Sequence, residues 1–157
     1  MRIAEYSIHR SKEYLVTRPE IHASLLAAVV NAQEAQIRAP KTSIVKHLCR
    51  EFKSEGWQAD FQFEQGKLHT QYFDFFRNRV AVGIEFSRYE FIYQDFIRFL
   101  AAYNANKIDV GVIITNTREG LERIKYKSSG SNYERVLEEL DWLCPTLTVP
   151  LWIIGLK

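Results

Sequence analysis

The alternation of apolar and polar residues is most regular between Tyr72 and Ser87, where it predicts a β-hairpin. Along the second arm, apolar side chains alternate with small or polar ones, Val80, Val82, Ile84 and Phe86 against Ala81, Gly83, Glu85 and Ser87. This period of two is that of a strand with two different faces. The polar residues 77–79 interrupt the pattern and include an asparagine, a residue that tolerates turn conformations.

The two arms of this hairpin each carry one carboxylate, Asp74 on the first and Glu85 on the second. A two-residue turn at 78–79 would place Asp74 opposite Gly83 and diagonal to Glu85. A turn one residue earlier would move Asp74 away from Glu85. Both alternatives leave the two carboxylates on one sheet face, and only the first brings them within reach of a shared ion.

Two carboxylates on one sheet face carry a chemical implication. Like charges so close repel and raise each other's pKa, and a hard divalent cation relieves that repulsion. Mg²⁺ is typically held by one or two carboxylates together with substrate phosphate oxygens. The hairpin therefore indicates a metal-dependent phosphoryl-transfer site. The alternative is a solvated sheet face with a salt bridge to Arg79 or Arg88.

Apolar periodicity predicts the other elements of the chain. Strands are expected at residues 1–10, 57–64, 108–115 and 149–156, and the third is a continuous apolar run of the kind that is buried on both faces. Helices are expected from Thr17 to about Gln36, from Thr42 or Ser43 to Gly56, from Ser87 through Tyr103, and from Ser131 through Trp142. Capping boxes are predicted at 17–20, 87–90 and 131–134. This order predicts an α/β fold with a mixed central sheet flanked by helices, in one domain of residues 1–157.

Composition narrows the class of protein. Of the 157 residues, 46% are hydrophobic and 25% are charged, as in globular domains. The net charge of +2 means that any nucleic-acid binding must come from a local basic surface. Cys49 and Cys144 show no metal-binding spacing and suggest a reducing compartment. No apolar run is long enough to span a membrane and no signal-peptide pattern occurs, so we expect a soluble cytoplasmic protein.

The run from Asp74 through Glu85, the amphipathic helix that follows and the apolar strand Ile108–Ile114 resemble the BglII/BamHI-like type II restriction endonucleases of the PD-(D/E)XK nuclease superfamily. The resemblance covers roughly residues 45–155. It implies a restriction-endonuclease-like core and Mg²⁺-dependent hydrolysis of double-stranded DNA at a short specific site. It implies Asp74 as a metal ligand, the main-chain carbonyl of Ile84 as a second, and Glu85 as the residue that orients or deprotonates the attacking water.

One position departs from the family pattern. The residue two before Glu85 carries a carboxylate in the family, and this chain has Gly83. We interpret Gly83 as a replaced acidic residue, which would leave the chain nearly inactive. An alternative register takes Glu85 as the second carboxylate and Ser87 as the third position. Glu51 or Glu55, from the preceding helix, is a candidate for a further acidic group, although a solvated face explains both.

DNA recognition needs basic groups for phosphates and small polar groups for base edges. The candidates lie in one stretch, and they are Arg118, Arg123, Lys125, Lys127, Ser129 and Asn132. Cutting both strands of a palindrome implies a homodimer, and the aromatic helix Phe91–Tyr103 or the helix from Thr17 is the expected interface. The competing functions are a catalytically inactive DNA-binding module on a nuclease fold and an α/β domain that binds no nucleic acid.

Overall fold

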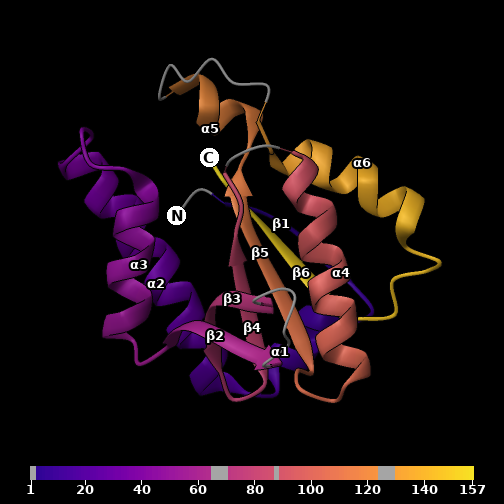
Figure 1. The fold of residues 1–157 in the computed structure, drawn as a ribbon. Coiled ribbons are helices and arrows are strands. Elements are labelled where there is room, and N and C mark those ends of the chain that lie inside the picture. Colours follow the sequence, from indigo (N-terminus) through magenta and orange to yellow (C-terminus); the bar gives the residue numbers. More distant parts are fainter. Residues whose placement is uncertain (1–2, 65–70, 87–88, 124–129) are drawn as a thin grey trace.

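A six-stranded mixed sheet forms the centre of the protein in a computed structural model that describes residues 3–64, 71–86, 89–123 and 130–157 (Figure 1). Its strands lie in the order β1-β6-β5-β4-β3-β2. Their bounds are β1 Ile3–Ile8, β2 Gln58–Glu64, β3 Gln71–Arg77, β4 Val80–Ile84, β5 Val110–Asn116 and β6 Leu151–Leu156. The pairs β4–β5 and β5–β6 are parallel and the other three are antiparallel. The predicted strands are all present.

Helices cover both faces of this sheet, on opposite sides of the strands in Figure 1. One face packs against α1 (Ser11–Val16), α2 (Pro19–Arg38) and α3 (Ile44–Ser54). The other packs against α4 (Glu90–Asn104) and α6 (Tyr133–Leu143), while the short helix α5 (Arg118–Arg123) follows β5. Every residue of β5 and β6 is buried, because these central strands have helices on both sides. The predicted α/β class with a mixed, helix-flanked sheet is confirmed.

Two helix starts differ from the predicted capping boxes. Helix α2 begins at Pro19 without a side-chain cap, and Thr17 instead donates its hydroxyl hydrogen bond to the carbonyl of Tyr14 at 2.7 Å. The prediction at 17–20 is wrong because an unforeseen short helix, α1, ends there and engages Thr17. Helix α6 is capped by Asn132, whose Oδ1 accepts from the amide of Arg135 at 3.0 Å, and not by its neighbour Ser131.

The other two helix starts complete this comparison. Ser43, one of the two alternatives for α3, caps that helix by accepting from the amide of Val45 at 3.3 Å. Helix α4 begins at Glu90 after Tyr89, and no side chain caps it. The expected cap Ser87 lies outside the described residues. Helix α5 (Arg118–Arg123) is not among the helices predicted from the sequence.

None of the helices in the described ranges is long and apolar enough to cross a membrane.

Candidate active site

The hairpin of β3 and β4 has the first of the two predicted registers. Phe76 pairs with Ala81 and Arg77 with Val80, which leaves Asn78 and Arg79 as the two turn residues. Their φ angles are 46° and 66°. Positive φ at both central positions is the conformation of a type I′ turn, whose twist matches that of the flanking strands. Continued by two pairs beyond Ala81, the same register places Asp74 opposite Gly83.

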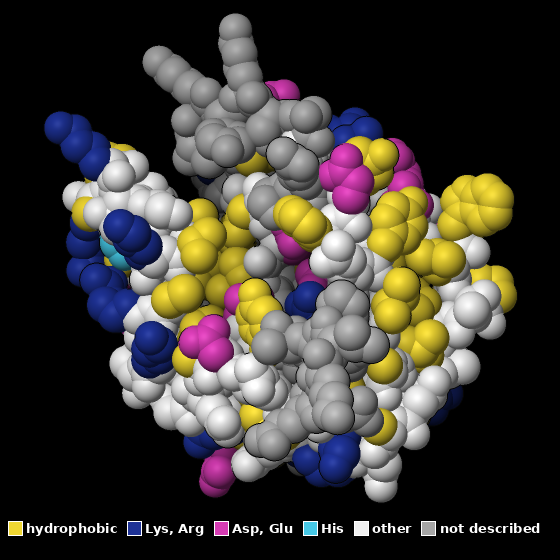
Figure 2. Space-filling model, viewed as in Figure 1, with side chains coloured by type: hydrophobic (Ala, Val, Ile, Leu, Met, Phe, Trp, Pro, Cys, Tyr) yellow, Lys and Arg dark blue, Asp and Glu magenta, His cyan; other side chains and the backbone are white. Residues whose placement is uncertain are grey.

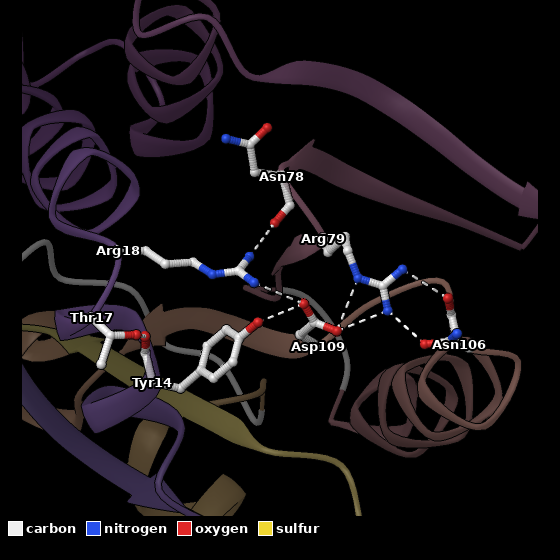
Figure 3. Close-up of polar contacts among 7 residues, drawn as sticks. All are labelled: Tyr14, Thr17, Arg18, Asn78, Arg79, Asn106 and Asp109. Atoms are coloured by element: carbon white, nitrogen blue, oxygen red, sulfur yellow. Dashed lines mark hydrogen bonds and ion pairs between the residues drawn. The ribbon is translucent and has the colours of Figure 1, made fainter.

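The carboxylate of Asp109, directly before β5, anchors this turn (Figure 3). It accepts hydrogen bonds from Arg79 Nε at 2.9 Å and Nη2 at 2.8 Å, and from the Tyr14 hydroxyl at 2.5 Å. Arg18 Nη2 lies 3.2 Å from its Oδ2. The bonds from Arg79 hold the pKa of Asp109 below its usual range. Burial and the bond to Asp109 raise the pKa of Tyr14 to about 12. These contacts connect the hairpin turn to the start of β5 and to the segment between α1 and α2.

Asp74 lies where regular pairing between β3 and β4 stops. The main-chain amide of Ile84 donates to Asp74 Oδ2 at 2.7 Å, so a side chain takes the place of a strand partner. Burial raises the pKa of Asp74, against the opposing effects of this hydrogen bond and of Arg98. The partly buried carboxylate of Asp74 therefore lies at the open end of the hairpin and is hydrogen-bonded to Ile84, the residue before Glu85.

Glu85 follows β4 directly and is 7% exposed. Its amide donates to the carbonyl of Ile114 at 2.9 Å, which continues the alignment of β4 with β5 beyond the strand end. A third carboxylate, Asp95 of α4, is 6% exposed. Burial raises the pKa of Asp95 to about 7, Arg98 opposes this, and the charges of Glu85 and Asp74 add to it. The charges of Glu85 and Asp74 therefore act on Asp95, although burial is the main cause of its raised pKa.

Asp95 is a buried carboxylate near the hairpin that the pattern analysis did not single out. Its signal was present, because Asp95 stands in the buried stripe of α4 between Ile92 and Phe99, where every neighbour on that stripe is apolar. A charged residue in such a stripe is seldom buried without a partner. Its partner within the helix is Arg98, whose Nη1 lies 2.9 Å from Asp95 Oδ1.

The oxygen atoms of Asp74, Glu85 and the Ile84 carbonyl are of the kind that a hard cation binds. Carboxylates and a main-chain carbonyl are the oxygen ligands that Mg²⁺ accepts, and Mg²⁺ keeps several of its waters. Within the ranges that the structure describes, no three acidic, histidine or cysteine side chains are grouped so that they could hold a metal ion. Of the other acidic candidates, Glu51 pairs with Arg50 at 2.8 Å, and the carbonyl of Glu55 accepts from Arg77 at 2.6 Å.

An open groove of about 1250 Å³ reaches Ile84 at the end of β4, but Asp74, Glu85 and Asp95 are not among its lining residues. Ile84 and Phe86 line it, with residues of the α2–α3 connection on one side and of α5 on the other. Its basic lining residues are Lys41, Arg123 and Lys157. In Figure 2, acidic and basic side chains are also visible in a recess near the middle of the view.

The structure describes only some of the predicted DNA-contacting residues. Arg118 and Arg123 both lie on α5, where Arg123 pairs with Glu119 at 2.6 Å and Arg118 lies 3.7 Å from Glu138. Lys125, Lys127 and Ser129 lie outside the described residues. Asn132 is buried, and its side chain caps α6.

Two solved structures share this fold. Restriction endonuclease BglII complexed with a DNA 16-mer matches with a TM-score of 0.75 at 19% identity, over 100% of this chain and 78% of that one. Free BglII matches with a TM-score of 0.64 at 18% identity, over 100% and 80%. Among curated proteins, none matches this chain. The family model of restriction endonuclease BglII/BglIII matches residues 3–156. The protein therefore belongs to the restriction endonuclease BglII/BglIII family, as the resemblance of its hairpin, helix and buried strand predicted.

Proposed function

We propose that this restriction endonuclease hydrolyses phosphodiester bonds of double-stranded DNA with Mg²⁺, as a BamHI-like member of the PD-(D/E)XK superfamily. The observation that carries the proposal is the pair Asp74 and Glu85, on adjacent strands of a fold that belongs to a family of restriction endonucleases. Burial raises the pKa of Asp74, so a cation beside it would stabilise its ionised form.

We propose a different role for each residue of the site. When bound, Mg²⁺ polarises the phosphate and lowers the pKa of a coordinated water. Asp74 and the carbonyl of Ile84 are the groups that would hold the ion. The hydrogen bond from the Ile84 amide to Asp74 Oδ2 orients that carboxylate. Glu85 would accept a proton from the attacking water at its carboxylate.

Double-stranded DNA is the proposed substrate because BglII is described in complex with a DNA 16-mer and shares this fold. Lys41, Arg123 and Lys157 line a groove that Asp74 and Glu85 do not line, so we propose them as contacts to phosphates away from the one that is cleaved. Basic groups spaced around a groove position phosphates without reading sequence. Arg118 on α5, together with Lys125, Lys127 and Ser129, stays a candidate contact for the same duplex.

A homodimer is proposed from the apolar surface of α4 and α6. Ile97 on α4 is 66% exposed and Trp142 on α6 is 84% exposed, with Phe91 and Tyr93 also exposed. Tyr93 donates its hydroxyl hydrogen to Glu139, so the two helices are in contact at this surface. Figure 2 shows apolar side chains gathered over α4 and α6 on the right of the view. Two subunits related by a two-fold axis would bring one site to each DNA strand.

A cytoplasmic location fits the two cysteines, Cys49 and Cys144, which are both free in this structure. Free thiols persist in reducing compartments.

The second candidate is a DNA-binding module that has lost catalysis, and Gly83 favours it, because the family pattern has a carboxylate there. A gel-shift assay with Ca²⁺ followed by a cleavage assay with Mg²⁺ separates the two. The DNA should be long and of mixed sequence, so that it contains most short sites. Binding with cutting into discrete fragments supports the endonuclease. Binding without cutting supports the inactive module, and the absence of both refutes a DNA function.

A further inference from the structure

Helix α3 presents its cations to solvent on one side. Lys46, Arg50 and Lys53 follow one another at helical spacing, so they share one face of the helix, and all three are exposed. Phe52 on the opposite side is buried, and its ring stacks on that of Phe75 in β3 with centroids 4.8 Å apart. This packing fixes the helix on the sheet. We call the three exposed cations the α3 stripe.

Few negative charges offset the α3 stripe. Glu51 is the one acidic residue between Ile44 and Ser54, and it pairs with Arg50 at 2.8 Å. Lys46 and Lys53 form no salt bridge with any residue that the structure describes. Figure 2 shows Lys and Arg side chains gathered over α3 along the left edge of the view. An exposed face held by salt bridges alternates in sign, and this one does not.

The α3 stripe lies between the hairpin carboxylate and the open groove. Cys49, one helical turn before Lys53, is near enough to Asp74 to feel its charge. Burial and then the charge of Asp74 raise the pKa of Cys49, while Lys53 lowers it. Residues 43–45 at the start of the helix line the groove together with Lys41. Cations therefore follow α3 from the groove to the side of the proposed reaction centre.

The packing of α3 decides which polyanion the stripe fits. An amphipathic helix binds an anionic membrane by burying its apolar side in the lipid, but the apolar side of α3 is already buried against the sheet. A row of cations on a fixed helix fits a row of phosphates instead. From Lys46 to Lys53 the helix rises about 10 Å, which is about three base-pair steps along one DNA strand.

We propose that the α3 stripe holds the phosphate backbone of double-stranded DNA beside the phosphate that is cleaved. This inference rests on the proposed function. It gives the exposed face of α3 a binding role, where salt bridges and solvation alone would leave two lysines without a partner in the described part of the chain. Contacts to phosphates fix the position of a duplex without reading its sequence, so the stripe should act on DNA of any sequence.

Binding of a fluorescent mixed-sequence duplex to the full-length protein, followed by anisotropy with Ca²⁺ at about 50 to 200 mM KCl, tests the proposal without cleavage. The double variant Lys46→Gln with Lys53→Gln should bind at least about tenfold more weakly at the lower salt concentration. It should also make the dependence of log Kd on log salt concentration less steep by about 2 for each bound subunit. Lys46→Arg with Lys53→Arg keeps both charges and should bind nearly as the wild type does.

A matched control removes two lysine charges from other parts of the surface. Lys12→Gln with Lys107→Gln changes α1 and the connection before β5, and should alter neither the affinity nor the salt dependence. All of these variants should melt near the wild-type temperature in calorimetry, because exposed substitutions seldom change stability by much.

The outcomes separate this inference from the proposed function. A wild-type chain that binds the duplex, with Lys46→Gln and Lys53→Gln together matching the control double variant, overturns only the role of the α3 stripe. An equal loss of binding in the control would mean that net charge alone is responsible, and it overturns the stripe as well. A wild-type chain that binds no duplex at any of these salt concentrations overturns both.

Discussion

Asp74 combines a structural and a chemical role, and two substitutions should separate them. Its Oδ2 accepts the Ile84 amide at 2.7 Å in place of a strand partner. Asp74→Ala leaves that amide without its acceptor, at a cost of about 1–3 kcal/mol in the free energy of unfolding. Asp74→Asn keeps an oxygen there. It also removes a carboxylate whose pKa is raised by burial, so it should be at least as stable as the wild type at pH 7.

These magnitudes give a measurable difference in melting temperature. For a chain of this size, 1 kcal/mol shifts the midpoint by about 2–4 °C. Asp74→Ala should therefore melt about 2–12 °C below Asp74→Asn in calorimetry at pH 7. Both variants should lose Mg²⁺-dependent cleavage, because neither carries the negative charge that the cation needs. Cleavage by Asp74→Asn at the wild-type rate would refute Asp74 as a metal ligand, and equal melting of the two variants would refute the structural role of the hydrogen bond.

Three further variants test other parts of the structure. Asp109→Asn should lower the free energy of unfolding at neutral pH, measured by urea unfolding. Because the pKa of Asp109 is lowered in the folded state, the difference in unfolding free energy from the wild type should shrink as the pH falls below about 4. A difference that stays constant with pH would contradict this. Ile97→Glu should weaken a dimer at least about tenfold in analytical sedimentation, since Ile97 is 66% exposed on α4; a wild-type monomer at micromolar concentration would exclude that interface. Gly120→Ala should lose about 1–3 kcal/mol, because its Cβ would lie 2.4 Å from the carbonyl oxygen of Leu156. Gly83→Ala, with no contact under 3.5 Å, is its control and should unfold at nearly the wild-type urea concentration.

The strands and the hairpin register were predictable because their determinants are local. Alternation along residues 80–86 and the polar residues 77–79 limit the hairpin to two registers, and the structure shows the one that continues to Asp74 opposite Gly83. Helix starts were less predictable because adjacent residues compete for the same role. Ser131 and Asn132 can both cap a helix, and in the structure Asn132 is the cap.

The position of Asp95 shows a different limit. The pattern marks it as a charged residue in an apolar stripe, but the pattern does not say what lies opposite that stripe. Only the packing of α4 across β4 places Asp95 beside Gly83. A site assembled from a strand and a helix that follows it depends on the angle between them, which sequence spacing does not encode.

The pairing of β1 with β6 has a consequence for how the protein is made. Ile3 pairs with Leu156 and Ile8 with Leu151, so the first strand has its neighbour almost at the far end of the chain. A ribosome releases residues in order, and β1 must wait for β6 before its hydrogen bonds form. The hairpin of β3 and β4 can form much earlier, since its partners are close in sequence. In a nascent chain the hairpin that carries Asp74 therefore belongs to an incomplete sheet, and the sheet is completed only after residue 156 has been synthesised.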